Sequence, residues 1–160
     1  MLHIVLFEPE IPQNTGNIVR TASVTGVRLH LIEPLGFEIS DKQLKRAGLD
    51  YWSGTDIVTH ESYDAFLDYC RSNISGGVRP QIYYVETDSK YRYDEADYTV
   101  DKDIYLVFGS ETKGLPKEIL RDNYDYTLSI PMRKGSRSLN LANCVAIVLY
   151  EALRQRGFTF

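Results

Sequence analysis

Short apolar runs alternate with amphipathic segments along the chain. The apolar runs have the length and composition of buried strands at 2–7, 27–32, 82–86, 104–108 and 126–129, with a weaker strand at 56–59. The segments between them predict helices at 16–25, 41–47, 63–71, 116–121 and 139–155. Strands that alternate with helices predict an α/β fold, in which helices flank a mostly parallel sheet.

The last predicted helix contains seven successive apolar residues, from Cys144 to Tyr150. A helix that covers one side of a sheet shows an apolar stripe, whereas this segment is apolar all round. Either the chain itself buries every side of the helix, or a second subunit covers its outer face. The small size of the domain favours the second arrangement, so we expect a homodimer that forms through the C-terminal helix.

The 160 residues fit a single domain, 1–160, and we find no linker or repeat that would divide it. No apolar run approaches the roughly 20 residues that span a bilayer, so we expect no membrane segment. The two cysteines lie far apart, and the three histidines lack the spacing of metal ligands. We therefore expect neither a disulfide nor a metal site, and a reducing, cytoplasmic location fits this pattern.

The net charge of −4 argues weakly against a nucleic-acid partner. However, seven acidic residues fall between 86 and 103, and the remainder of the chain carries a small basic excess. The overall charge therefore does not decide the question. Locally, Lys42, Lys45 and Arg46 form a basic stripe at positions i, i+3 and i+4 of a predicted helix. That stripe fits either contact with RNA or an ordinary solvated surface.

The polar stretch after the first strand is the first candidate for chemistry. Pro12, Asn14 and Gly16 predict a turn, after which a helix begins. Asn14, Asn17 and Arg20 recur every three residues and so share one edge of that helix. An arginine near a helix start at the end of a strand suits an anionic ligand. Two capping asparagines and a solvated arginine are the structural alternative.

A glycine loop after the strand at 104–108 is the second candidate. Gly109 and Gly114 have the glycine spacing of a phosphate-binding P-loop, but Leu115 and Pro116 stand where that motif requires Lys and Ser or Thr. What remains is a tight turn that places Glu111 at the crevice where open α/β sheets bind ligands. An ordinary connection between strand and helix is the alternative.

The third candidate is the basic loop that leads into the last helix. Ser138 is the predicted N-cap of that helix, and Asn140 falls in its first turn. Amides and side chains at such a helix start can bind a ligand, although a helix start alone explains the same pattern.

Together the three stretches resemble a known set of motifs. NxGNxxR at 14–20, FGSExxGLP at 108–116 and IPMxxxxxSLNLxN at 130–143 are similar, in this order, to the motifs of the SPOUT superfamily of RNA 2′-O-methyltransferases. The resemblance covers nearly the whole chain. It implies an enzyme that uses S-adenosyl-L-methionine, and it is strongest for single-domain members that methylate the ribose of the wobble nucleotide of tRNA (position 34, cytidine or modified uridine).

The resemblance also carries expectations for fold and residues. It implies a C-terminal deep trefoil knot, which composition cannot suggest because knots are almost absent from proteins. The positions implied to bind the cofactor are Val85, Thr87, Gly109, Ile130 and Ser138. The positions implied to act in catalysis are Arg20, Asn14, Glu111, Ser138 and Asn140. Lys42, Lys45 and Arg46 are implied to contact tRNA.

Two questions stay open from the sequence. Arg20 can act as a fixed positive charge beside the developing alkoxide, which the reluctance of arginine to lose its proton favours, or as the base itself. The substrate can be another tRNA position or ribosomal RNA, and a non-catalytic RNA-binding module of the same fold is a further alternative. An unrelated dinucleotide-binding enzyme is disfavoured because no GxGxxG loop follows the first strand.

Overall fold

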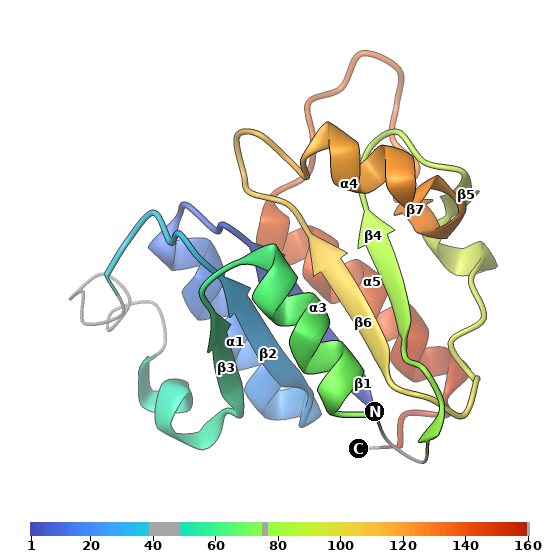
Figure 1. Ribbon diagram of the computed structural model, residues 1–160. Coiled ribbons are helices and arrows are strands. Elements are labelled where there is room, and N and C mark those ends of the chain that lie inside the picture. Colours follow the sequence, from blue (N-terminus) through green and yellow to red (C-terminus); the bar gives the residue numbers. More distant parts are fainter. Residues whose placement is uncertain (39–48, 75–76, 160) are drawn as a thin grey trace.

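The computed structural model describes residues 1–38, 49–74 and 77–159 (Figure 1). Its strands are β1 (Leu2–Phe7), β2 (Arg28–Ile32), β3 (Ile57–His60), β4 (Gln81–Val85), β5 (Tyr91–Arg92), β6 (Ile104–Phe108) and β7 (Thr127–Ser129). Its helices are α1 (Pro12–Thr25), α3 (Tyr63–Ser72), α4 (Lys117–Asp122) and α5 (Leu141–Gln155), with short 3₁₀ helices at Leu49–Gly54, Tyr93–Glu95 and Tyr124–Tyr126.

These strands form one seven-stranded sheet in the order β3-β2-β1-β6-β4-β7-β5, and each pairing between them is parallel. β1 and β6 lie at its centre, and every residue of both strands is buried. Burial on both faces explains why their sequences are continuous apolar runs rather than alternating ones. The predicted α/β fold with a parallel sheet is confirmed.

Helices cover both faces of the sheet (Figure 1). On one face, α1 and α5 pack on the side chains of β1 that include Ile4 and Leu6. On the other face, α3 and α4 pack on the alternate residues, among them Val5 and Phe7. The two-residue period of a strand thus divides β1 between two hydrophobic cores.

The connection between β4 and β6 contacts later parts of the chain, namely β7 and the end of α5. β7 inserts between β4 and β5, although β4 and β5 are consecutive in the sequence. The chain then returns from β5 to β6 past the far end of α5. There the Arg156 guanidinium donates to the backbone carbonyls of Tyr98 (2.6 Å) and Val100 (3.3 Å), and Tyr98 itself is fully buried. The segment before β6 therefore fixes the end of the last helix.

A row of buried histidines crosses three neighbouring strands. His3 Nδ1 lies 3.1 Å from His30 Nε2, and His30 Nδ1 lies 2.9 Å from His60 Nε2. Burial is the main cause that lowers the pKa of His3 to about 4 and of His30 to about 2, and burial also lowers the pKa of His60. The three rings are therefore neutral near pH 7. A neutral ring has one N–H, so both hydrogen bonds run in the same direction along the row.

Two predicted helix starts are wrong. α1 begins at Pro12, so Asn14 and Gly16 belong to its first turns and not to a preceding turn, because proline suits the first helical position. Ser138 is not the N-cap of α5. Asn140 takes that place, because its Oδ1 accepts hydrogen bonds from the backbone N–H groups of residues 142 and 143. The helix expected at 41–47 lies outside the described residues.

α5 is not buried by its own chain on every side. Val145 and Leu149 are fully buried, whereas Ile147 is 37% and Tyr150 45% exposed. Of the two arrangements that the sequence left open, burial of the whole helix within one chain is thus wrong. Within the described ranges, the helices are too short or too polar to cross a membrane. Those ranges also contain no cluster of His, Cys, Asp or Glu side chains arranged to hold a metal ion.

Candidate active site

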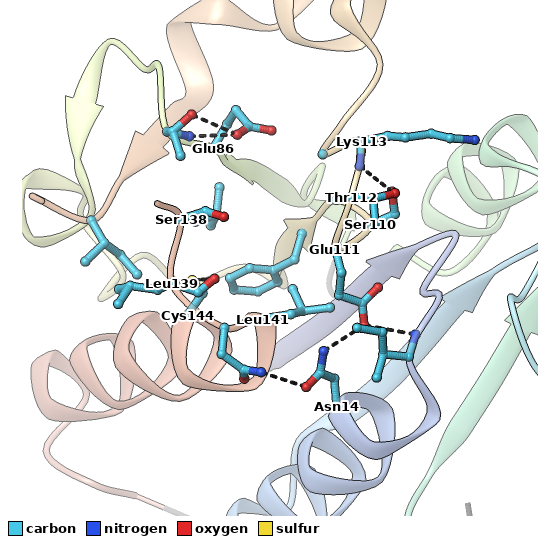
Figure 2. A pocket seen from close by; sticks show the side chains of 18 of the residues that line it. Asn14, Glu86, Ser110, Glu111, Thr112, Lys113, Ser138, Leu139, Leu141 and Cys144 are labelled. Carbon is cyan, nitrogen blue, oxygen red and sulfur yellow. Dashed lines mark hydrogen bonds between the residues drawn. The ribbon is translucent and has the colours of Figure 1, made fainter. Parts of the chain in front are cut away.

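A cavity of about 600 Å³ opens beyond the carboxyl ends of β4, β6 and β7 (Figure 2). Its wall combines four stretches that are distant in the sequence: the start of α1, the residues after β4, the turn after β6, and the loop from β7 into α5. Parallel sheets bind ligands at this edge because the loops that follow their strands converge there. The volume is typical of a small-molecule site.

The turn after β6 is shaped by two glycines. A Cβ atom at Gly109 would lie only 2.2 Å from the carbonyl carbon of Gly114, so no larger residue fits without moving the backbone. Gly114 has φ = +67°, a left-handed conformation that favours glycine. The Gly114 N–H donates to the carbonyl of Ser110 (3.0 Å) and closes the turn. This turn presents Glu111 to the start of α1.

Glu111 ties that turn to α1. Its carboxylate accepts hydrogen bonds from the backbone N–H groups of Glu10 (2.8 Å) and Ile11 (3.2 Å) and from Asn14 Nδ2 (3.0 Å). In return, the carboxylate of Glu10 accepts from the backbone N–H and the hydroxyl of Thr112. With three donors already bound, Glu111 is placed to position the loop rather than to accept a substrate proton.

Asn140 joins the third loop to the same network. Its Nδ2 donates to Asn14 Oδ1 (2.8 Å), while its Oδ1 caps α5. The Nδ2 of Asn14 in turn donates a hydrogen bond to the carboxylate of Glu111. Asn14 is thus hydrogen-bonded to Glu111, 97 positions later in the sequence, and to Asn140, 126 positions later. The structure brings these three predicted catalytic residues together.

The five positions predicted to bind the cofactor all line the cavity: Val85, Thr87, Gly109, Ile130 and Ser138. Apolar side chains, including Phe108 and Leu141, offer a surface for an adenine ring, and polar residues such as Thr87 and Ser138 lie beside them. The residues present therefore fit a nucleoside-type cofactor.

Glu86 is a wall residue that the sequence analysis did not single out. Its carboxylate accepts hydrogen bonds from the backbone N–H (2.8 Å) and hydroxyl (3.2 Å) of Thr87 and from the backbone N–H of Leu115 (3.2 Å). It thereby links the end of β4 to the glycine turn. In the sequence it was one of seven acids in a polar stretch, and nothing distinguished it. Cys144 also lines the cavity, and burial raises the pKa of its thiol, which disfavours the reactive thiolate.

Arg20 is not among the residues that line the cavity. It lies on α1, exposed, with its guanidinium carbon 5.2 Å from the centre of the Tyr51 ring. The structure therefore does not bring Arg20 together with Asn14, Glu111 and Asn140 within one chain. Lys42, Lys45 and Arg46 lie outside the described residues.

Comparison with known proteins gives consistent matches. Residues 1–150 match the model of the SpoU rRNA methylase family. The tRNA (cytidine(34)-2′-O)-methyltransferase of Saccharophagus degradans is 49% identical over 99% of this chain and 97% of its own length. A structure that gives insights into 2-OH methylation of C/U34 on tRNA superposes with a TM-score of 0.87 at 44% identity, over 99% of this chain and 98% of the other.

A more distant match carries a ligand. The SpoU methyltransferase AviRb from Streptomyces viridochromogenes, solved in complex with the cofactor AdoMet, has a TM-score of 0.87 and 28% identity. The match covers 99% of this chain and 62% of AviRb.

Proposed function

The chain belongs to the SpoU rRNA methylase family, and from that premise we propose that it methylates the ribose 2′-hydroxyl of the wobble nucleotide of tRNA. The target is cytidine or modified uridine at position 34, and S-adenosyl-L-methionine (AdoMet) is the methyl donor. The observation that carries this proposal is the convergence of four distant stretches on one cavity, cross-linked by Glu111, Asn14 and Asn140.

AdoMet supplies a methyl group that is already activated as part of a sulfonium. The chain contributes binding and alignment: Val85, Gly109 and Ile130 from the cavity wall, and Thr87 and Ser138 as polar groups beside them. Holding donor and ribose in line replaces a random encounter with an oriented one, which lowers the barrier.

The ribose hydroxyl must lose its proton as the new bond forms. Glu111 is a poor base here because its carboxylate already accepts three hydrogen bonds. We assign Arg20 the role of a fixed positive charge that stabilises the developing alkoxide, with the proton passing to water or to an RNA phosphate. Since Arg20 does not line the cavity of its own chain, it requires the RNA or a second copy of the chain to bring it to the reacting ribose.

A homodimer through the outer face of α5 is part of the same proposal. Ile147 and Tyr150 are large side chains exposed on this helix, and contact with a second copy would remove them from water. Sedimentation of the purified protein tests this assembly: a monomer at micromolar concentration would refute it.

The deep trefoil knot is likewise proposed. Its support is the insertion of β7 between β4 and β5, followed by α5, whose end lies against the segment that returns to β6. In this proposal, the chain from β7 to α5 passes through the loop formed by residues 86–103. We also propose that the protein acts in the cytoplasm, where tRNA is processed.

Mapping of ribose methylation by mass spectrometry, in cells with and without this protein, tests the function. Loss of the methyl group at position 34 of tRNA, restored by the purified protein with AdoMet, is the expected result. The family description names rRNA, so loss of a methyl group from ribosomal RNA, with position 34 unchanged, would instead establish that substrate. Unchanged methylation of both would refute the proposal.

A further inference from the structure

Six of the fifteen lysines and arginines in the described ranges form an ion pair with an acidic side chain. The ion pairs are Arg28–Asp56, Arg71–Asp68, Lys90–Asp125, Arg92–Asp94, Arg121–Asp122 and Arg154–Glu151. By contrast, the side chains of Lys113, Arg133, Lys134 and Arg137 make no ion pair or hydrogen bond with any described residue. We call these four residues the basic rim.

The basic rim lies at the mouth of the cavity. Lys113 belongs to the glycine turn and is itself a wall residue. The other three belong to the loop between β7 and α5, which extends beyond the ends of the strands and in which residues 131–140 are all exposed (Figure 1). Met132 and Ser138 of this loop line the cavity, so Arg133 and Arg137 each follow or precede a wall residue directly.

The loop between β7 and α5 turns tightly at Arg133 and Lys134. Gly135 has φ = +78°, and the backbone N–H of Ser136 donates to the carbonyl of Arg133 (3.1 Å), which makes a tight turn at the tip of the loop. The two carboxylates of the cavity wall, Glu86 and Glu111, are occupied by hydrogen bonds from backbone and side-chain donors. Neither therefore pairs with the rim, which keeps its positive charge toward solvent.

We propose that the basic rim binds the phosphodiesters of the nucleotides on either side of the target ribose. This proposal rests on the proposed function, and it names the surface that holds the RNA backbone. A chain with an overall charge of −4 gains little attraction for RNA from its total charge. Unpaired cations concentrated at the cavity mouth supply that attraction where it orients the substrate.

The test compares RNA binding by the whole protein and by the double variant Arg133→Gln/Lys134→Gln. The probe is a fluorescent anticodon stem-loop hairpin, measured by anisotropy at several salt concentrations. Each contact with a phosphate of single-stranded RNA contributes about −0.7 to the slope of log K against log salt. Loss of two contacts should flatten the slope by about 1.4 and, if both proteins bind alike near about 1 M salt, weaken binding about 25-fold at 0.1 M salt.

A matched control removes the same charge elsewhere. Arg71→Gln/Arg79→Gln changes two exposed cations near the opposite, amino-terminal end of β4, and it should leave both affinity and slope nearly unchanged. A hairpin with a permuted loop sequence should lose the same factor with the rim variant, because phosphate contacts do not depend on base sequence. Calorimetry with AdoMet should show an affinity unchanged within about twofold, since Arg133 and Lys134 do not line the cavity.

Three results would overturn the proposal: unchanged RNA affinity and salt slope in the rim variant, an equal loss in the control, or a loss of AdoMet affinity in the rim variant. The proposed function is judged separately, by whether the unaltered protein methylates tRNA. If it methylates tRNA while the rim variant binds RNA normally, the rim proposal alone falls. If it methylates no tRNA while the difference in RNA binding persists, the rim proposal stands and the function falls.

Discussion

Acidification should destabilise this protein through its row of buried histidines. His3 and His30 are neutral in the folded protein because burial lowers the pKa of each, to about 4 and about 2. Nearby charges modify the effect on His3: Asp103 raises its pKa, while the amino terminus and Arg28 lower it. In the unfolded chain both rings titrate near their ordinary pKa of 6.5. As the pH falls below about 6.5, the two histidines therefore become protonated in the unfolded state but stay neutral in the folded state, and unfolding becomes more favourable.

The size of the effect follows from these values. Between pH 7 and pH 5, each histidine that stays neutral in the fold but titrates at pH 6.5 when unfolded lowers the free energy of unfolding by about 2 kcal/mol. His3 and His30 together then contribute about 4 kcal/mol, and His60 adds to it in the same direction. This loss is a large fraction of the ordinary stability of a domain, which is roughly 5–15 kcal/mol.

Urea unfolding at pH 7, 6 and 5, followed by circular dichroism, measures this effect. The control variant His30→Gln keeps a donor and an acceptor in the middle of the row but cannot titrate. It should be less stable at pH 7, yet lose about 2 kcal/mol less than the unaltered protein between pH 7 and pH 5. A free energy of unfolding that stays constant within about 1 kcal/mol over this interval would refute the argument, because two buried neutral histidines require a larger change.

Three substitutions test the site. Asn14→Asp would place a second carboxylate about 3 Å from Glu111 and remove the donor between them, so calorimetry should show AdoMet binding strongly weakened, and unfolding should show a cost of about 1–3 kcal/mol. Gly109→Ala would bring a methyl group against the backbone of Gly114, so AdoMet affinity should fall at least about tenfold, which equilibrium dialysis would detect. Arg20→Ala should abolish methylation of tRNA in a radiolabel assay while AdoMet affinity stays within about twofold, because Arg20 does not line the cavity.

Matched variants control for general damage. Asn17→Asp makes the same chemical change at an exposed position of α1, and Gly54→Ala adds the same methyl group where nothing lies within 4 Å. Both should bind AdoMet normally. If Asn17→Asp weakens binding as much as Asn14→Asp, the network is not the cause. If Arg20→Ala loses AdoMet affinity, Arg20 acts on the cofactor and not on the ribose.

The sequence predicted the central strands best. The bounds of β1 and β6 match the apolar runs to the residue, because strands buried on both faces leave an uninterrupted signal. β5 has only two residues, Tyr91 and Arg92, both exposed, so no hydrophobic pattern could indicate it. The start of α5 was misplaced because two polar residues, Ser138 and Asn140, precede the apolar run, and spacing alone does not tell which side chain turns back to the backbone.

The sequence predicted most of the residues of the site but not the hydrogen bonds that join them. Motif resemblance pointed to Asn14, Glu111 and Asn140, and the structure joins them. That Asn140 Nδ2 donates to Asn14, and Asn14 to Glu111, depends on how the loops pack, which local pattern does not encode. Glu86 was missed because its partner, the backbone N–H of Leu115, is supplied by a turn 29 residues away. The motif also groups Arg20 with Asn14, whereas in the structure only Asn14 lines the cavity.

The contact between the end of α5 and the segment around Tyr98 has a consequence for folding during synthesis. On the ribosome, the strands up to β7 emerge before the stretch that completes the cavity, which begins near Ser138 and reaches Cys144. The sheet can thus form before the chain is able to bind a methyl donor. α5 must then dock against the segment around Tyr98, which has already been synthesised. Capture of the donor by ribosome-bound chains of increasing length would therefore time that last docking event.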